Sequence, residues 1–380
     1  MEIDGHCDAR FDGVRQAFAS NFDELGDIGA SVAATVDGES VVDLWGGTCA
    51  TDAGPGRPWQ RDTIINVWST TKTMSFLVTL MLADRGLLDL DAPVADVWPE
   101  FATGGKDRID TKHVLSHSAG LSGFDVVTTA HDLTDHDLVC GRLAAQAPWW
   151  EPGTASGYHA VTQGYLLGEI ARRVGGRSMG RFLADEVTGP LDADFHIGTA
   201  AEHDDRVAHV DPPPNALGGD LAPGTIAHRT FATLPLDASA SQTHEWRRAE
   251  IPAAGGHGNA RSVARVMSVL ANGGSLDGRQ FLSAAMCDRI FEEQQHGNDL
   301  VLDRPLRLGL GFGLSSDDMP LPNDRCCFWG GWGGSLALVD MEHRVSFSYV
   351  MNDMRESTTG DDRAGRLLMA LYGSLGAEVG

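Results

Sequence analysis

Hydrophobic positions near the amino terminus first follow a helical period and then a strand-like one. Four apolar residues recur every three to four positions: Phe11, Val14, Phe18 and Phe22. This spacing predicts an amphipathic helix over residues 8–24. Two apolar runs at 30–36 and 40–44 follow, and the Asp37-Gly38 pair between them is typical of a hairpin turn. The amino-terminal part is therefore expected to contribute one helix and two antiparallel strands.

The middle of the chain has mostly helical patterns. The apolar run Phe76–Leu82 predicts a buried helix that begins near Ser69 and ends at Gly86. Further helices are predicted over three ranges: 111–118, 161–174 and 262–270. Residues 203–250 are rich in Pro, Gly, Asp and His and have no clear period. They are interpreted as a long excursion, and long loops in compact proteins often bind ligands.

The carboxyl-terminal part returns to strands, predicted at 308–314, 333–340 and 345–351, before a closing helix at 363–372. Strands therefore come from both ends of the chain, and helices fill the middle. This arrangement predicts an α/β (α+β) fold, an antiparallel sheet flanked by helices with a mostly helical lobe inserted. The expected division is residues 1–86 and 300–380 for the sheet lobe, and 87–299 for the helical lobe with its pocket-lining loops.

Composition narrows the classes of partner. The chain has 380 residues and a formal net charge of −24 at pH 7, which argues against nucleic acid and anionic membrane surfaces as partners. No apolar run is long enough to span a bilayer, and the acidic start, MEIDGH, is not typical of a secretory signal. These features predict a cytoplasmic protein whose six cysteines are free thiols. The oligomeric state stays open.

The segment that enters the apolar helix carries a Ser-x-x-Lys pattern, Ser69 to Lys72. Residues three apart on a helix are neighbours, so the two side chains are expected on one face. A serine hydroxyl is a weak nucleophile until a base takes its proton, and a desolvated lysine can be that base. The simpler alternative is a helix N-cap followed by a surface lysine. Against that alternative, the chain has three lysines, and only Lys72 has a serine three residues earlier.

A Ser–Lys pair needs a second proton carrier and a second donor to the oxyanion. Tyr158 stands in the loop PGTASGYHA, residues 152–160, which leads into a predicted helix. Beside a lysine ammonium, this phenol is expected to have a lowered pKa. The alternative is a tyrosine that only packs the loop, and spacing alone favours that alternative.

Glycines interrupt the late segment FWGGWGGS, residues 328–335. Glycine inside a strand marks the close approach of another group to the backbone, so an N–H here is a candidate oxyanion donor. A glycine-rich bend between strands is the alternative. Three indoles are candidates for an acyl pocket, although indoles are more often part of a core: Trp149, Trp150 and Trp332.

Two further patterns compete with this assignment. The run Gly176–Gly180 fits Gly-x-Ser-x-Gly, the nucleophile elbow of α/β-hydrolases. An elbow needs a strand before the serine, but a helix precedes this run, so Ser178 is predicted to be an N-cap. His113 and His117 have the i, i+4 spacing of a zinc helix, but no glutamate follows His113. The sequence therefore predicts no metal site.

Three of these segments occur in the order found in the serine β-lactamase and penicillin-binding-protein superfamily. They are Ser69-Thr70-Thr71-Lys72, the Pro-Gly-x4-Tyr loop that ends at Tyr158, and the late glycine strand. Residues 115–121 and 253–274 also resemble that superfamily. The closest resemblance is to the family VIII carboxylesterases, which are built like class C β-lactamases, and it covers residues 10–375. The resemblance implies the β-lactamase-like fold.

The resemblance also implies a role for each matched residue. Ser69 matches the acylated nucleophile and Lys72 matches its proton acceptor. Tyr158 matches the tyrosine that carries the proton to or from the leaving group. The backbone N–H groups of Ser69 and Trp332 match the oxyanion hole. The substrate pocket is expected to include five more residues: Trp150, His159, Trp329, Gly330 and Gly331.

Two departures separate this chain from β-lactamases. Their Lys-Thr-Gly motif is replaced by Trp329-Gly330-Gly331, and the asparagine of their tyrosine motif is replaced by Ala160. Those groups grip the carboxylate and the amide of a β-lactam, and an uncharged ester needs neither. The expected function is hydrolysis of small or short-chain carboxylic esters through an acyl-enzyme on Ser69, without a metal or organic cofactor. The alternatives are acyl transfer to a small-molecule acceptor, a weak β-lactamase or D-amino-acid peptidase, and a non-catalytic binding module.

Overall fold

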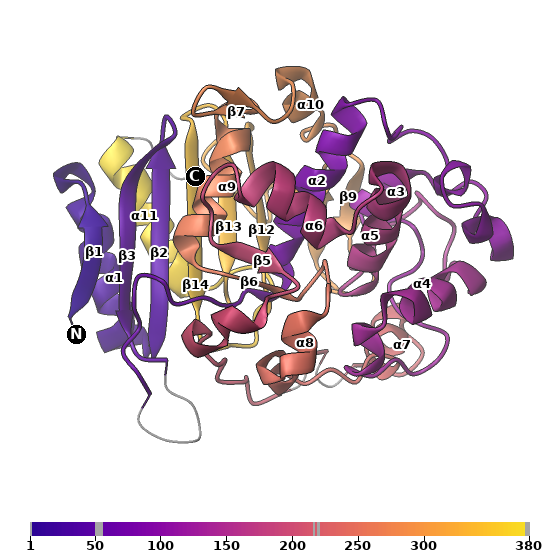
Figure 1. The fold of residues 1–380 in the computed structure, drawn as a ribbon, viewed down its shortest axis with the longest axis horizontal. Helices are drawn as coiled ribbons and strands as arrows, with labels where there is room; N and C mark the ends of the chain where they lie inside the picture. Colours follow the sequence, from indigo (N-terminus) through magenta and orange to yellow (C-terminus); the bar gives the residue numbers. More distant parts are fainter. Residues whose placement is uncertain (1, 50–55, 216, 219–220, 377–380) are drawn as a thin grey trace.

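The structure is a computed structural model that describes residues 2–49, 56–215, 217–218 and 221–376. Among these residues the largest element is a nine-stranded sheet with antiparallel neighbours (Figure 1). Its strands lie in this order: β1 (Ile3–Cys7), β3 (Glu39–Gly47), β2 (Gly29–Val36), β14 (Val345–Met351), β13 (Leu336–Asp340), β12 (Cys326–Gly330), β11 (Gly313–Leu314), β10 (Pro305–Leu308) and β9 (Gln295–Asn298). The pairing of β2 with β14 joins the two ends of the chain and confirms the predicted sheet.

Helices cover both faces of the large sheet (Figure 1). On one face, α1 (Asp12–Leu25) packs against α11 (Asp362–Leu375), and the apolar stripe of α1 is buried as its spacing predicts. On the other face, α9 (Ala260–Ala271) contacts β14, β2 and β13. The sheet is therefore the middle layer of a three-layer arrangement.

The remaining helices form a second region beside the sheet (Figure 1). Its centre is α2 (Lys72–Asp84), whose side chains are buried from Lys72 to Leu82. Helices α5 (Thr162–Gly175) and α6 (Met179–Leu183) pack against α2, and α3 (Thr111–Leu115) and α4 (His136–Ala145) pack against α5. The remaining α-helices and strands in the described residues are α7 (Ile226–Ala232), α8 (His244–Arg248), α10 (Ala284–Arg289), β4 (Ile65–Asn66), β5 (Phe195–Ile197), β6 (Gly256–Gly258), β7 (Ser275–Leu276) and β8 (Arg279–Gln280).

The expected division into lobes needs one correction. Residues 87–299 were assigned to the helical lobe, yet α9 packs on the large sheet and β9 is one of its strands. The hydrophobic pattern identifies α9 as a helix, but it carries no information about which surface covers its apolar face. A division into two lobes, with α9 and β9 moved to the sheet lobe, stays our proposal.

Local differences from the expected elements have physical causes. The strand expected at 308–314 is two short strands, because the chain reverses between Leu308 and Gly313, which pair with each other. The strand expected at 333–340 begins at Leu336, since Gly333 and Gly334 adopt φ of 99° and 118° in a turn. Strand β1 was not expected. Parts of the loop before Pro58 (residues 50–55) and of the 203–250 excursion (216, 219 and 220) lie outside the described residues.

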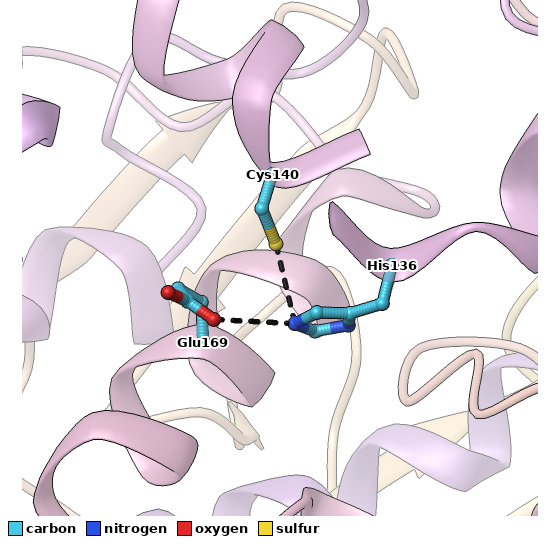
Figure 2. Close-up of side chains that lie close together, drawn as sticks. All are labelled: His136, Cys140 and Glu169. Atoms are coloured by element: carbon cyan, nitrogen blue, oxygen red, sulfur yellow. Dashed lines mark hydrogen bonds and ion pairs between the residues drawn. The ribbon is translucent and has the colours of Figure 1, made fainter. Parts of the chain in front are cut away.

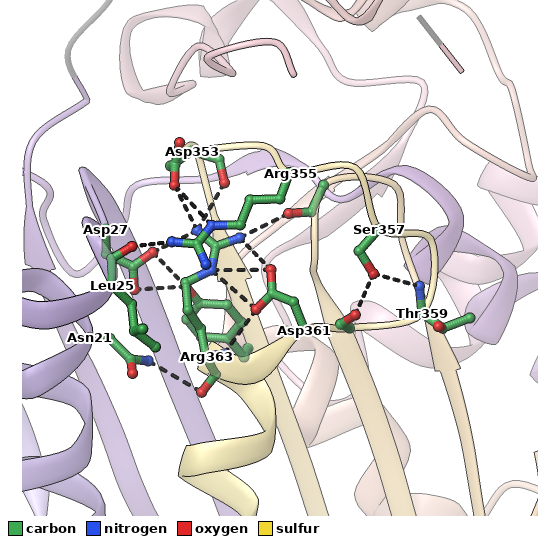
Figure 3. Close-up of polar contacts among 12 residues, drawn as sticks. Asn21, Leu25, Asp27, Asp353, Arg355, Ser357, Thr359, Asp361 and Arg363 are labelled. Carbon is green, nitrogen blue, oxygen red and sulfur yellow. Dashed lines mark hydrogen bonds and ion pairs between the residues drawn. The ribbon is translucent and has the colours of Figure 1, made fainter. Parts of the chain in front are cut away.

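A buried group of charges joins α11 to the sheet. Figure 3 shows Arg363 surrounded by acceptors, and its side chain is fully buried. Its Nη1 donates to Asp27 Oδ1 at 2.8 Å and to Asp353 Oδ2 at 3.1 Å. Its Nη2 donates to Asp361 Oδ2 at 2.6 Å and to the carbonyl oxygen of Gly333 at 2.9 Å. Arg363 therefore holds the turn that follows β12 as well as three carboxylates.

We predict that Arg363→Met lowers the free energy of unfolding by about 3–5 kcal/mol, because it leaves buried carboxylates without a counter-charge. Urea unfolding followed by circular dichroism measures the change. Arg366→Met is the matched control on the same helix, since its partner Glu24 is exposed, and a surface pair contributes about 1 kcal/mol or less. Equal losses for the two variants would contradict the prediction.

Candidate active site

The serine predicted to be the nucleophile lies in a tight turn at the start of the apolar helix. A 3-10 turn, Trp68–Thr71, leads directly into α2, and Ser69 is buried within it. Trp68 has a φ of 48°, in the left-handed region that residues other than glycine seldom adopt. Its ring packs on two other indoles, with centroid distances of 5.6 Å to Trp246 and 4.9 Å to Trp332. These contacts hold the turn and fix the position of the Ser69 hydroxyl.

The structure brings the three predicted side chains together. Lys72 Nζ lies 3.0 Å from Ser69 Oγ and 3.2 Å from the hydroxyl of Tyr158. The Tyr158 hydroxyl is itself 2.5 Å from Ser69 Oγ. Lys72 Nζ also lies 2.7 Å from the carbonyl oxygen of Ala160 and 3.0 Å from that of Ala253. The lysine is thus enclosed by one hydroxyl pair and two backbone acceptors.

Burial favours the neutral form of this lysine. Desolvation lowers the pKa of Lys72 well below its ordinary value of 10.5. A neutral amine has two N–H groups, which the carbonyls of Ala160 and Ala253 accept, and its lone pair is left for the Ser69 hydroxyl. The geometry therefore permits Lys72 to take the proton of Ser69 during an attack on a carbonyl carbon.

The pKa of Tyr158 moves opposite to the sequence-based expectation. Burial raises the pKa of the phenol above its ordinary value of 10.0, and the charge of Asp299 raises it further. The expectation of a lowered pKa assumed a charged lysine, whereas a neutral Lys72 gives no such attraction. Tyr158 therefore stays a phenol that can donate a proton.

Asp299 positions Tyr158 and was not found from the sequence. Its side chain is fully buried, and its Oδ1 accepts the backbone N–H of Tyr158 at 2.9 Å. The same oxygen accepts the N–H groups of Val301 and Leu302, each at 2.9 Å. Nothing in the local sequence marks a loop aspartate that binds a segment 141 residues away.

Two residues expected in the substrate pocket support the tyrosine loop from behind, which corrects the prediction. His159 is fully buried, and its ring contacts the carbonyl oxygen of Gly157 at 2.6 Å and the N–H of Leu121 at 3.1 Å. Burial lowers the pKa of His159 to about 3, so the ring is neutral. Trp150 packs directly under Gly157, where an added Cβ would lie 2.6 Å from the indole. Both side chains are therefore occupied in shaping the loop.

The glycine segment lies against the backbone of the nucleophile turn. An added Cβ at Gly331 would lie 3.2 Å from Ser69 N and 2.4 Å from the carbonyl oxygen of Val67. Ser335 ties the two segments, since its Oγ contacts that same carbonyl at 3.0 Å and Thr70 Oγ1 at 2.9 Å. Gly331 therefore lies beside the amide of Ser69, and the Trp332 amide that follows it stays the predicted second oxyanion donor.

The other two pocket candidates pack tightly. An added Cβ at Gly330 would lie 2.4 Å from the Cα of Thr359, so only glycine fits there. Trp329 stacks on His117 with ring centroids 5.1 Å apart, and it meets Phe76 edge to face. Trp329 thus forms the wall behind Tyr158, and the sequence did not predict its partner His117.

A small cavity opens beside Ser69. Its volume is about 10 Å³, close to the space that one water molecule needs. Its lining is mostly apolar, and Trp68, Leu217 and Leu236 add to the predicted residues. The two leucines come from the 203–250 excursion, which therefore shapes this cavity.

Several other sequence-based predictions have a clear outcome. Ser178 caps α6, because its Oγ accepts the N–H of Arg181 at 3.3 Å, so the Gly-x-Ser-x-Gly run is no nucleophile elbow. The six cysteines are free thiols as expected. In the part of the chain that the structure describes, none of the helices combines the length and the apolar character that crossing a membrane requires. The cytoplasmic location stays a prediction.

Comparison with known proteins gives matches over nearly the whole chain. The family model described as Beta-lactamase matches residues 18–371. The "Esterase/beta-lactamase LipL" of Mycobacterium tuberculosis is 36% identical over 95% of this chain and 85% of its own length. A family VIII carboxylesterase structure has a TM-score of 0.92 at 42% identity, over 98% of this chain and 100% of the other. A penicillin-binding-protein homolog from Caulobacter crescentus has a TM-score of 0.89 at 41% identity, with the same coverage. These matches confirm the resemblance drawn from the sequence.

We predict that the rate at which p-nitrophenyl acetate acylates Ser69 rises with pH as Lys72 loses its proton. The midpoint is expected well below 10.5, because burial lowers the pKa of Lys72. The rate is expected not to fall between about pH 8 and pH 10, since the raised pKa of Tyr158 keeps its phenol protonated. Stopped-flow release of p-nitrophenolate measures the profile.

Lys106 provides the control for this profile. It is also buried, its pKa is lowered to about 8, and its Nζ donates to the carbonyl oxygens of Thr103 and Ala144, away from Ser69. Lys106→Met is expected to keep the rise with pH, and Lys72→Met is expected to lose it together with most of the rate. The same rise in Lys72→Met would rule out Lys72 as the base.

Proposed function

We propose that this chain, which belongs to the beta-lactamase family, is a serine hydrolase that cleaves small carboxylic esters through an acyl-enzyme on Ser69. The observation that carries the proposal is the convergence of Lys72 Nζ and the Tyr158 hydroxyl on Ser69 Oγ, at 3.0 Å and 2.5 Å. The similar family VIII carboxylesterase and LipL, named an esterase and beta-lactamase, support the ester chemistry.

The first half of the reaction forms the acyl-enzyme. Ser69 Oγ attacks the ester carbonyl, and the neutral amine of Lys72 takes its proton. The N–H groups of Ser69 and Trp332 stabilise the oxyanion of the tetrahedral intermediate. Tyr158 donates its proton to the departing alkoxide, and the Lys72 ammonium, 3.2 Å away, returns a proton to the phenolate.

The second half releases the acid. A water molecule attacks the acyl carbonyl, and Lys72, with Tyr158, accepts the proton of that water. The intermediate collapses, the acid leaves, and Ser69 Oγ regains a proton from the same pair. The site needs no group beyond these side chains and backbone amides for either half.

The surroundings of Ser69 favour an uncharged and short acyl group. The carbonyl of Ala160 is bound to Lys72, and the methyl side chain at this position offers no hydrogen bond to a substrate amide. The cavity has room for about one water molecule and is lined by Trp68, Trp332 and Leu236 among other residues. An acyl group enters only as this wall moves, and a longer chain requires a larger movement. We therefore propose acetyl-sized to butyryl-sized esters as the preferred class.

We predict that the chain hydrolyses p-nitrophenyl acetate and butyrate faster than the octanoate, with little turnover of a chromogenic cephalosporin. Ser69→Ala is expected to lower kcat at least about 1,000-fold, because no other group forms the acyl-enzyme. Ser178→Ala, in the competing motif, is the control and is expected to keep the rate. Full esterase activity in Ser69→Ala would overturn the proposal. Acylation of Ser69 without release of acid, relieved by an added alcohol, would instead identify an acyltransferase.

We predict that Gly331→Ala lowers kcat for p-nitrophenyl acetate by about 100-fold to 1,000-fold, the cost of one lost oxyanion donor. The new methyl group would meet Val67 and Ser335 and push the Trp332 amide away from Ser69. Gly297→Ala is the control, since an added Cβ at this position of β9 contacts nothing within 4 Å. An unchanged kcat in folded Gly331→Ala would contradict the placement of the oxyanion hole.

A further inference from the structure

A histidine, a cysteine and a glutamate meet between two helices away from the active site. His136 and Cys140 lie one turn apart on α4, and Glu169 projects from α5. Figure 2 shows the three side chains pointing toward one another. One ligand atom from each lies within 4.8 Å of the other two. These are three different types of metal-binding side chain at one place, and the proposed active-site chemistry uses none of them.

Two of the three distances between these atoms match those in a tetrahedral site, and the third, from Cys140 Sγ to the Glu169 carboxylate, is within 4.8 Å. His136 Nε2 lies 3.3 Å from Cys140 Sγ and 3.4 Å from Glu169 Oε2. Ligand atoms bound tetrahedrally to zinc at about 2.0–2.3 Å are separated from one another by about 3.3–3.6 Å. Without an ion, the single nitrogen Nε2 is the partner of both the sulfur and the carboxylate. An ion would satisfy the lone pairs of all three groups at once.

The arginines beside Glu169 leave room for this bond. Glu169 Oε1 accepts Arg172 Nη2 at 2.8 Å and Arg173 Nε at 2.6 Å, and Oε2 accepts Arg172 Nε at 2.7 Å. A carboxylate has about four lone-pair positions, so one position on Oε2 remains on the side that faces His136. The two arginines keep the carboxylate ionised and fix its orientation, as outer-shell partners do in metal sites.

Solvent reaches this place from one side. A cavity of about 630 Å³ is lined by His136 and Arg172 together with Asp135 and Asp137, and the His136 side chain is 27% exposed. Cys140 and Glu169 are buried behind it. An ion can therefore enter past His136 and retain a water molecule as its fourth ligand, while the acidic residues at the opening attract cations.

We propose that His136, Cys140 and Glu169 form a binding site for one zinc ion, with water as the fourth ligand. A thiolate, an imidazole and a carboxylate are the three side-chain ligands that zinc sites in proteins use. Binding forms a zinc–sulfur bond and releases the thiol proton of Cys140 to solvent. The ion links α4 to α5 and stabilises the packing of these helices, and it takes no part in the ester chemistry.

Cobalt(II) titration of the full chain, first dialysed against a chelator, tests the site. One equivalent of Co²⁺ is expected to produce a thiolate-to-cobalt absorption band in the near ultraviolet, and Zn²⁺ is expected to abolish it. Cys140→Ser and His136→Asn are each expected to weaken Co²⁺ binding by more than about 100-fold, since loss of even an outer-shell partner costs 10-fold to 100-fold. Zn²⁺ is expected to raise the thermal midpoint of the wild type and not that of His136→Asn.

Cys287→Ser is the matched control, because Cys287 is an equally buried thiol on α10. This variant is expected to keep the cobalt band and the thermal shift. Absence of the band in the wild type would overturn the proposal, and so would a band of equal intensity in Cys140→Ser. His136→Asn, which changes a partly exposed side chain, is the second variant if Cys140→Ser does not fold. Neither the cobalt band nor the thermal midpoint depends on esterase activity.

Discussion

The burial of Lys72 is the condition on which the chemistry proposed for the site depends. The side chain begins a helix that is buried along most of its length, and this desolvation lowers the pKa of Lys72. In water the same lysine would be charged and unable to take the proton of Ser69. In the proposed mechanism, the apolar run that follows Lys72 therefore serves the chemistry as well as the core.

Segments from distant parts of the chain exclude solvent from the amine of Lys72. The carbonyls of Ala160 and Ala253 close around the amine. Helix α5 packs tightly on the segment that contains Ala253. An added Cβ at Gly164 of α5 would lie 2.3 Å from Ala253 N. On the far side, Ser335 joins the sheet to the nucleophile turn through Thr70. The sheet and the helical region thus meet at Ser69, and the acyl-enzyme proposal depends on both.

Helix α5 positions residues of both proposed sites. It begins directly after the loop that carries Tyr158, so its position helps to place the phenol hydroxyl within 2.5 Å of Ser69 Oγ. Farther along, its Glu169 faces α4 in the cluster proposed to bind zinc. That cluster was not predicted from the sequence, because the helical spacing of His136 and Cys140 provides only two of its three groups. The third group comes from another helix, so spacing within one segment cannot reveal it.

By itself the sequence determined the elements and the chemistry that local order controls. Helical periods located α1, α5, α9 and α11, and a turn pair located the β2–β3 hairpin. Three motifs in order identified the family, and they are the basis for proposing Ser69, Lys72 and Tyr158 as the catalytic residues. Only the tertiary structure decided the environment of these residues. Asp299 and Ala253 lie 141 and 181 residues from the groups they bind, and His159 turned out to support a loop from behind. Periodicity and spacing describe which face a residue occupies, whereas desolvation and hydrogen bonding depend on what another segment places against that face.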